Sequence, residues 1–117
     1  MVIRIKQLRL RTIIGVNEWE RKKRQDLTIN VEIHFDGAEA AESDDLEKSV
    51  DYKSLTKKII RSVEGSSFFL LERLADHILE IIMQNERVQA ARVEVDKPHA
   101  LRFADSVSLE VSRNRSE

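Results

Sequence analysis

The sequence predicts an α+β fold in which two helices cover one face of a four-stranded antiparallel sheet. Four segments alternate apolar and polar residues with the period of a β-strand, and two segments repeat apolar residues at the spacing of one helix face. Their order along the chain is strand, strand, helix, helix, strand, strand. Because strict alternation leaves each strand with one polar face, this pattern favours an antiparallel sheet that is covered on one side only.

The first predicted strand, residues 2–13, changes the parity of its apolar positions midway. Odd positions are apolar before Lys6-Gln7 and even positions are apolar after it, which predicts a β-bulge at that point. The other three strands are predicted near residues 27–35, 88–96 and 105–112, where the alternation is uninterrupted.

The first predicted helix follows Asp51, a suitable N-cap residue, and stops at Gly65. The second begins near Leu70 and ends near Asn85. The apolar stripe of the first is formed by Tyr52, Leu55, Thr56, Ile59, Ile60 and Val63, and that of the second by Leu71, Leu74, Ala75, Ile78, Leu79 and Ile82.

Length and composition narrow the class of protein. A chain of 117 residues suits one domain, predicted over residues 1–113, with residues 114–117 as a flexible C-terminal tail. The 20 basic and 21 acidic residues nearly cancel, which argues against a nucleic-acid or polybasic membrane surface. The absence of cysteine excludes disulfides and thiol catalysis, and no apolar run approaches the roughly 20 residues that cross a bilayer. We therefore expect a soluble cytoplasmic protein.

The second face of the predicted sheet is polar. It has two interpretations: plain solvent exposure, or the wall of a channel formed when several copies join their sheets into a barrel. The residues on this face are Thr28, Asn30, Glu32, Arg92, Glu94, Ser106, Ser108 and Glu110.

One candidate for chemistry is Lys97, which stands where the third predicted strand meets the only proline, Pro98. Proline fixes its own φ and keeps the preceding residue extended, so this amine is held on a stiff backbone and suits acid–base work. The simpler interpretation is that Lys-Pro ends a strand and keeps its edge soluble.

Three further residues have both a structural and a chemical interpretation. Glu20 follows the only tryptophan, Trp19, and is either an acid–base group or a solubilising loop residue. Tyr52 opens the first helix, where a tyrosine is usually a half-buried packing residue, and it is kept as a candidate for chemistry. Glu72, in the first turn of the second helix, favours the helix dipole, or grips a flat ring through paired N–H donors.

Metal and phosphate motifs are not found. No two of His34, His77 and His99 have metal-ligand spacing, and no glycine-rich phosphate loop or Gly-x-Ser-x-Gly elbow occurs. The sequence therefore predicts no metal site.

Taken together, several motifs resemble those of the dihydroneopterin aldolases and the related dihydroneopterin triphosphate 2′-epimerases. They occur in family order from one end of the chain to the other. They are Ile14-Gly15-Val16 with Glu20 and Gln25, Ser43-Asp44-Asp45, Val50-Asp51-Tyr52, Phe69-Leu70-Leu71-Glu72 and Val95-Asp96-Lys97-Pro98. The resemblance implies the tunnelling fold (T-fold), a homo-oligomer built from tetrameric rings that usually stack into an octamer, and active sites between subunits.

The resemblance also implies roles for single residues in a pterin pocket. Glu72 would bind the 2-amino group and N3 of the ring, and the backbone at Leu71 and Val50 would add hydrogen bonds. The catalytic residues would be Lys97, Tyr52 and Glu20.

The implied reaction is a retro-aldol cleavage between C1′ and C2′ of the pterin side chain, a step toward folate. The C6=N5 imine of the substrate accepts the electrons, so no cofactor is implied. By resemblance, Lys97 would manage the protons at N5 and the 2′-oxygen, Tyr52 would protonate the enol carbon, and Glu20 would position a water or the lysine.

The motifs divide between aldolase and epimerase. Trp19-Glu20 and Ser43-Asp44-Asp45 look like the aldolases, whereas residues 3–12 and 99–107 look like the triphosphate epimerases. We expect the aldolase as the main activity and keep the epimerase as the alternative.

Arg102 and His99 would meet a triphosphate, although Arg102 also fits a solvated loop. A third hypothesis is a non-catalytic, ring-forming protein that binds pterins or purines, in which Glu72 matters and Lys97 and Tyr52 do not.

Overall fold

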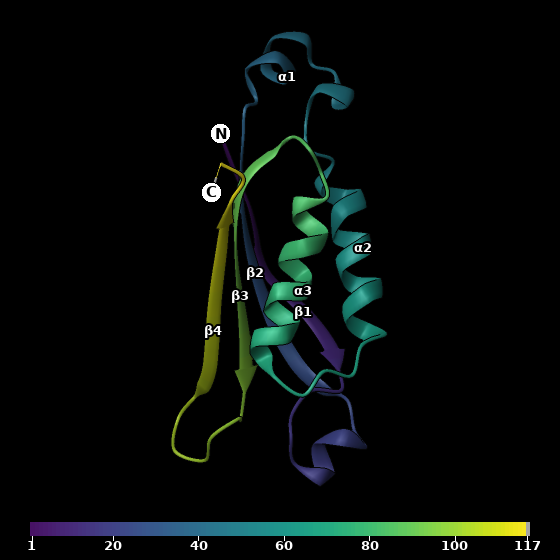
Figure 1. The fold of residues 1–117 in the computed structure, drawn as a ribbon, viewed down its shortest axis with the longest axis vertical. Coiled ribbons are helices and arrows are strands. Elements are labelled where there is room, and N and C mark those ends of the chain that lie inside the picture. Colours follow the sequence, from purple (N-terminus) through teal and green to yellow (C-terminus); the bar gives the residue numbers. More distant parts are fainter. Residues whose placement is uncertain (117) are drawn as a thin grey trace.

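The computed structural model describes residues 1–116 and confirms the predicted α+β fold. Four antiparallel strands form one sheet in the order β1-β2-β3-β4, and two long helices lie side by side on one of its faces (Figure 1). The strands are β1 (Val2–Thr12), β2 (Gln25–Phe35), β3 (Val88–Pro98) and β4 (Ser106–Asn114).

The two helices that cover the sheet are α2 (Tyr52–Glu64) and α3 (Leu71–Met83). The predicted N-cap is confirmed, because the Asp51 carboxylate accepts from the backbone N–H of Ser54 at 3.1 Å, and α2 ends at Gly65. Alternate residues of the strands and the apolar stripes of both helices form one buried core between the layers. Its largest fully buried side chains are Ile14, Leu27, Ile29, Ile33, Ile59, Leu74, Ile78, Leu79, Ile82, Val50, Val63 and Val88.

The predicted bulge in β1 is confirmed. The register between β1 and β2 shifts between Ile5 and Leu8, and Gln7 takes a left-handed φ of 57°. The extra residue turns the second half of the strand over, so apolar residues from both halves face the core.

The end of β1 is tied to the end of α2 by a buried hydroxyl. Thr12 Oγ1 donates to the backbone carbonyls of Val63 and Ser66, at 2.7 and 2.9 Å. A buried hydroxyl without partners would be costly, so these bonds hold the β1–β2 connection against the α2–α3 connection. Both connections line the site described below.

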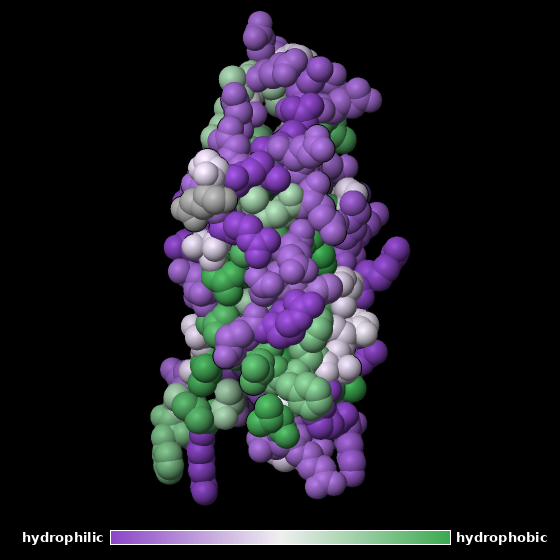
Figure 2. Space-filling view, viewed as in Figure 1, coloured by the Kyte–Doolittle hydropathy of each residue, from purple (hydrophilic) through white to green (hydrophobic). Residues whose placement is uncertain are grey.

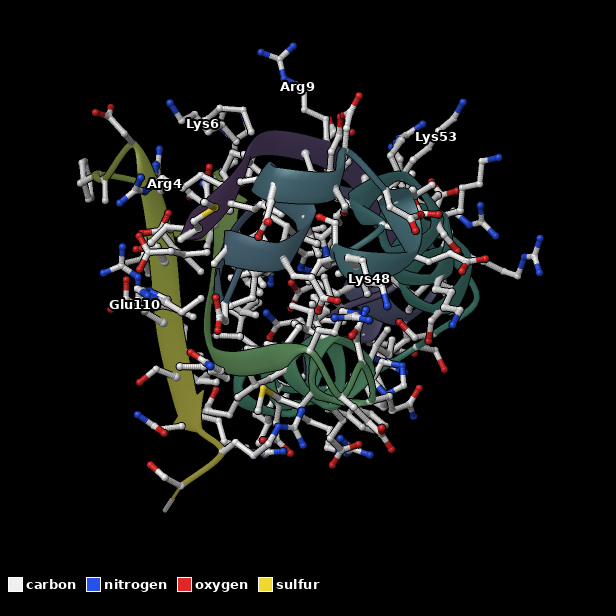
Figure 3. All side chains as sticks on the ribbon, turned by 90° about the horizontal axis from the view of Figure 1, so that it is seen from above. Arg4, Lys6, Arg9, Lys48, Lys53 and Glu110 are labelled. Atoms are coloured by element: carbon white, nitrogen blue, oxygen red, sulfur yellow. The ribbon has the colours of Figure 1, made fainter. Side chains whose placement is uncertain are left out.

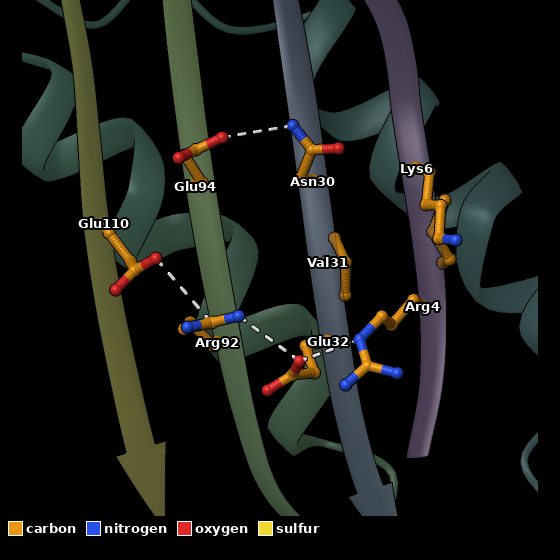
Figure 4. A pocket seen from close by; sticks show the side chains of 9 residues that line it. Arg4, Lys6, Asn30, Val31, Glu32, Arg92, Glu94 and Glu110 are labelled. Atoms are coloured by element: carbon orange, nitrogen blue, oxygen red, sulfur yellow. Dashed lines mark hydrogen bonds and ion pairs between the residues drawn. The ribbon is translucent and has the colours of Figure 1, made fainter.

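The uncovered face of the sheet carries a row of charges that crosses all four strands (Figure 4). Glu32 accepts from Arg4 at 3.0 Å and from Arg92 at 3.2 Å, and Arg92 also lies 3.6 Å from Glu110. The hydrogen bond from His34, and then the charges of the two arginines, hold the pKa of Glu32 below its usual value. The predicted polar face is therefore present and internally paired.

Seen along the long axis of the molecule, Lys6 and Arg9 project outward from the free edge at β1, whereas Arg4 and Glu110 belong to the paired row on the uncovered face (Figure 3). No hydrogen-bonded neighbour covers the outer side of β1 or β4 in the sheet formed by residues 1–116.

Three short helices were not expected from the sequence. The 3-10 helix η1 (Glu18–Arg21) connects β1 to β2. The helices α1 (Ala38–Ser43) and η2 (Leu46–Lys48) form an arm that extends beyond the sheet at the top of Figure 1. The arm is polar in the space-filling view, and apolar surface gathers toward the opposite end (Figure 2).

The C-terminal residues contact the end of α3 and the start of β3. Asn114 is the last residue of β4, and the Arg115 side chain donates to the backbone carbonyls of Val88, Met83 and Asn85. Glu117, the end of the expected tail, lies outside the described residues. No helix within residues 1–116 is long and apolar enough to cross a membrane.

Candidate active site

The candidate site centres on an ion pair at the lower end of the sheet in Figure 1. Lys97, near the end of β3, places its Nζ 2.5 Å from Oε2 of Glu20 in η1. Both side chains are nearly removed from solvent, with 11% and 5% of their surfaces exposed. Two residues that the sequence singled out separately thus form one buried pair.

The remaining lone pairs of the Glu20 carboxylate are also occupied. Oε1 accepts from the Asn17 side chain at 2.8 Å and from its backbone N–H at 3.2 Å. Oε2 accepts from Gln25 Nε2 at 3.2 Å, and the same amide donates to the backbone carbonyl of Ile14 at 2.6 Å. The network therefore fixes the orientation of the carboxylate.

These contacts decide the protonation of Glu20. Burial alone would raise the pKa of this carboxyl, but hydrogen bonds from Lys97, Gln25 and Asn17, together with the lysine charge, outweigh it. The net result lowers the pKa of Glu20 from 4.5 to about 2. At neutral pH the carboxylate is an anion that holds and polarises the lysine ammonium rather than an acid with a proton to give.

Gly15 makes room for the carboxylate. Its φ of 128° is one that side-chain-bearing residues rarely adopt. A Cβ at this position would lie 2.2 Å from Cδ of Glu20. Both the backbone conformation and the close approach therefore require glycine here.

A pocket of about 290 Å³ opens beside the ion pair. One wall comes from the β1–β2 connection, including Val16 and Trp19, and the other comes from the start of α3 with Leu71 and Glu72. The first backbone N–H groups of a helix have no intrahelical partners, so this second wall offers both a carboxylate and free donors. That combination matches a flat heterocycle with a donor edge and acceptor atoms.

Tyr52 and Val50 are not part of this pocket. They lie at the opposite end of α2, which is roughly 18 Å long at 1.5 Å per residue. Tyr52 is 60% exposed and borders a different, apolar groove with Leu46 and Thr56. Val50 is buried, with 1% of its surface exposed.

The two residues expected to meet phosphate differ in position. His99 lines the pocket and has a left-handed φ of 62° at the start of the β3–β4 loop. Arg102 is exposed on that loop, 5.9 Å from the ring of Phe103, and does not line the pocket.

Sequence reasoning missed Asn17 and Arg21 as parts of the site. Asn17 was one polar residue in a polar loop, and Arg21 stood in a basic run with no periodicity. Within residues 1–116, no group of three or more acidic or histidine side chains is arranged to hold a metal ion.

The fold and this pocket define a T-fold protein with a pocket for a small molecule. The dihydroneopterin aldolase (FolB) family matches residues 3–112, and the chain belongs to this family.

Named relatives divide into two activities. The dihydroneopterin triphosphate 2′-epimerase of Pseudomonas aeruginosa is 50% identical over 113 residues, which is 97% of this chain and 92% of that protein. The epimerase of Escherichia coli K12 is 48% identical over 97% of this chain and 95% of its own length. The dihydroneopterin aldolase of the same E. coli strain is 30% identical, with 98% and 94% covered. These relatives are enzymes, and so is this chain.

Among solved structures, the crystal structure of E. coli dihydroneopterin aldolase in complex with neopterin superposes with a TM-score of 0.92. Its sequence is 31% identical, and the match covers 97% of this chain and 99% of that one. The expected T-fold is therefore confirmed.

Proposed function

We propose that this protein is a dihydroneopterin triphosphate 2′-epimerase. The observation that carries the proposal is the contrast in identity, 48–50% to the epimerases against 30% to the aldolase. The sequence reasoning had favoured the aldolase on Trp19-Glu20 and Ser43-Asp44-Asp45, and the relatives support its alternative better. The segment from His99 to Val107 resembles the epimerases and therefore favours the same activity as these relatives do.

Aldolase activity remains the second candidate, because both reactions begin with the same bond cleavage. A base removes the proton of the 2′-hydroxyl, and the C1′–C2′ bond breaks to leave an aldehyde at C2′. The electron pair moves into a C1′=C6 enol while N5 gains a proton. An aldolase then protonates C1′ while N5 loses its proton to restore the imine, and it releases the aldehyde. An epimerase instead re-forms the C1′–C2′ bond on the other face of the aldehyde, while N5 loses its proton and the 2′-oxygen gains one.

The pocket supports specific roles in that sequence. Glu72 and the free N–H groups at the start of α3 would bind the edge of the pterin. Lys97 would then lie near N5 and the 2′-oxygen and transfer protons there, directly or through water. Glu20 would hold the lysine in place, since its own low pKa leaves it ionised. The imine of the substrate accepts the electrons, so the steps require no cofactor.

The position of Tyr52 supports a site completed by a second copy. Within one chain this phenol cannot reach Lys97, because α2 separates the two ends of the molecule. A neighbouring copy would bring its Tyr52 and its Val50 backbone to the pocket. This arrangement is the ring of subunits that the family resemblance implies.

Exposed apolar residues at both ends support the same assembly. Val16, Trp19 and Phe69 surround the pocket with 60–65% of their surfaces exposed. Leu46 and Tyr52, 64% and 60% exposed, border the groove at the other end. Docking one end on the other would cover both apolar patches. The two free edges of the sheet, at β1 and β4, would also suit edge-to-edge pairing into a barrel with a polar interior.

One experiment separates the three hypotheses. The protein is incubated with dihydroneopterin and, separately, with its triphosphate, and the products are resolved by chromatography. Triphosphate inverted at C2′ supports the epimerase, and aldehyde release with 6-hydroxymethyl-dihydropterin supports the aldolase. Tight pterin binding without either product would overturn both and leave the non-catalytic binder.

The triphosphate would lie toward the β3–β4 loop. His99 lines the pocket and Arg102 is on the same loop, so we propose His99 as the nearer phosphate contact and Arg102 as an outer one. Replacing Arg102 by alanine should raise KM for the triphosphate and leave KM for dihydroneopterin unchanged. Equal changes for both substrates would contradict this assignment.

A further inference from the structure

The Arg21 side chain joins the two loops that form opposite walls of the pocket. Its Nη1 donates to the backbone carbonyls of Gly15, at 3.0 Å, and Phe68, at 2.9 Å, and its Nη2 donates to the carbonyl of Ser67. The same guanidinium lies over the ring of Phe69, with Cζ 3.9 Å from the ring centroid. One half-buried side chain thus makes three hydrogen bonds and a cation–π contact.

These contacts have a defined relation to the site. Gly15 leads into the loop that carries Glu20, and residues 67–69 lead directly into the first turn of α3, which carries Glu72. The backbone adds one long bond between the two loops, from the N–H of Gly15 to the carbonyl of Phe68 at 3.4 Å. The Thr12 hydroxyl ties the end of β1 to Val63 and Ser66, and Arg21 supplies the short side-chain hydrogen bonds nearer the pocket, to Gly15, Ser67 and Phe68.

We propose that Arg21 is a positioning residue, which sets the separation between the Glu20–Lys97 pair and the Glu72 wall. This inference rests on the proposed pterin site and adds a determinant of its width. Without Arg21 the start of α3 can move away from the ion pair, so the ring no longer meets its binding edge and the proton-transferring group together. The effect falls mainly on binding, since Arg21 touches neither Lys97 nor the reacting side chain.

Only a planar fork satisfies this geometry. A guanidinium presents donors on two nitrogens at a fixed angle and stacks flat on an aromatic ring, whereas an ammonium is a single point with freely rotating donors. Arg21→Lys should therefore weaken ligand binding only partly, and Arg21→Met, which keeps the apolar stem but has no donors, should weaken it more. The exposed Lys23 in the same basic run provides a matched control as Lys23→Met.

The test measures neopterin binding by calorimetry, and KM and kcat for the triphosphate, in the assembled wild-type, Arg21→Met, Arg21→Lys and Lys23→Met proteins. We expect Arg21→Met to raise Kd and KM about tenfold while kcat changes less than about threefold, with Arg21→Lys in between and Lys23→Met unchanged. A purely structural role would lower the melting temperature and leave Kd and KM of the folded protein at wild-type values, which would overturn the inference. A fall in kcat with unchanged Kd would overturn it too.

A second measurement does not depend on turnover. Amide hydrogen exchange of residues 67–72 should accelerate in Arg21→Lys and Arg21→Met, because the carbonyl ties of this loop are weakened. Unchanged exchange would contradict the inference even if the proteins are active. Wild-type protein that binds neopterin but turns over neither substrate would refute the proposed activity while the exchange and Kd comparisons still test Arg21.

Discussion

Lys97 and Glu20, 77 positions apart in the sequence, meet at 2.5 Å in the interior of the molecule. Water cannot replace this contact, because both side chains are almost fully buried. A buried pair of this kind is vulnerable to the loss of one member, which leaves the other charge without compensation. The pair is therefore both the proposed chemical centre of the pocket and a determinant of the stability of this end of the fold.

Replacing Lys97 by alanine should abolish turnover and largely spare ring binding. The amine is the proposed proton carrier, and general acid–base groups contribute about a hundredfold to ten-thousandfold in rate. Chromatographic turnover and calorimetric neopterin binding check the two expectations. Lys23→Ala, an exposed lysine, is the control. Normal turnover in Lys97→Ala would end the mechanistic assignment.

Glu20 should make stability depend on acid pH. Its pKa is about 2 in the folded protein against an ordinary value of 4.5, so between these values the unfolded state binds a proton that the folded state does not. Stability from this group is therefore complete above about pH 4.5 and is lost as pH falls toward 2.

Urea unfolding from pH 2 to pH 6 measures this dependence. Glu20→Gln should show a shallower fall of unfolding free energy with acidity than the wild type. Glu32→Gln is the comparison, because the pKa of Glu32 is also lowered, chiefly by its hydrogen bond with His34. Identical slopes for wild type and Glu20→Gln would show that the Glu20 carboxyl is not perturbed.

Gly15→Ala should be one of the most damaging small substitutions in the chain. The new Cβ would overlap the Glu20 carboxylate, and the alanine would have to adopt a φ of 128°. We expect a loss of about 2–4 kcal/mol in unfolding free energy, measured by urea denaturation, together with a loss of turnover.

Gly65→Ala is the matched control for that substitution. Gly65 has a φ of −88°, and the nearest atom to its added Cβ is the carbonyl oxygen of Arg61 at 3.3 Å. A cost of about 1 kcal/mol or less is expected there. Equal costs at the two positions would contradict the interpretation of Gly15.

Mixing two inactive variants should restore activity if the site forms between copies. Lys97→Ala retains Tyr52, and Tyr52→Phe retains Lys97, so mixed rings contain some sites with both groups. Random assembly from equal amounts gives roughly a quarter of the wild-type sites. The two proteins, carrying different tags, are unfolded and refolded together, and the doubly tagged fraction is assayed. No recovery in rings that contain both tags would place Tyr52 and Lys97 in separate sites.

Much of the fold could be predicted because periodicity reports burial. The alternation in β2 and the stripe of α3 identify their core faces directly. Gln25 shows where this fails: it begins β2 two residues before the expected start and turns a polar side chain inward to bond Glu20. A search for alternating apolar residues cannot detect a polar glutamine that points inward. The arm was missed because its six-residue helix α1 has no buried residue to create a pattern.

The site was only partly predictable. Lys97 and Glu20 could be named, but their contact depends on how the β1–β2 connection folds over the end of β3. The role of Gly15 follows from an atomic approach that no spacing reveals. That Tyr52 lies at the far end of α2 from the pocket could be known only from the direction in which α2 runs along the sheet. Local sequence predicts the helices and strands, but only the tertiary structure shows which of their residues come into contact.

The separation of Tyr52 from Lys97 by the length of α2 has a genetic consequence. If each centre draws one group from each of two polypeptides, a cell that carries one allele defective at Lys97 and another defective at Tyr52 would still assemble working centres. With equal expression, about a quarter of the centres would receive both intact groups, so the two defects would complement each other, which a site built within one polypeptide would not allow.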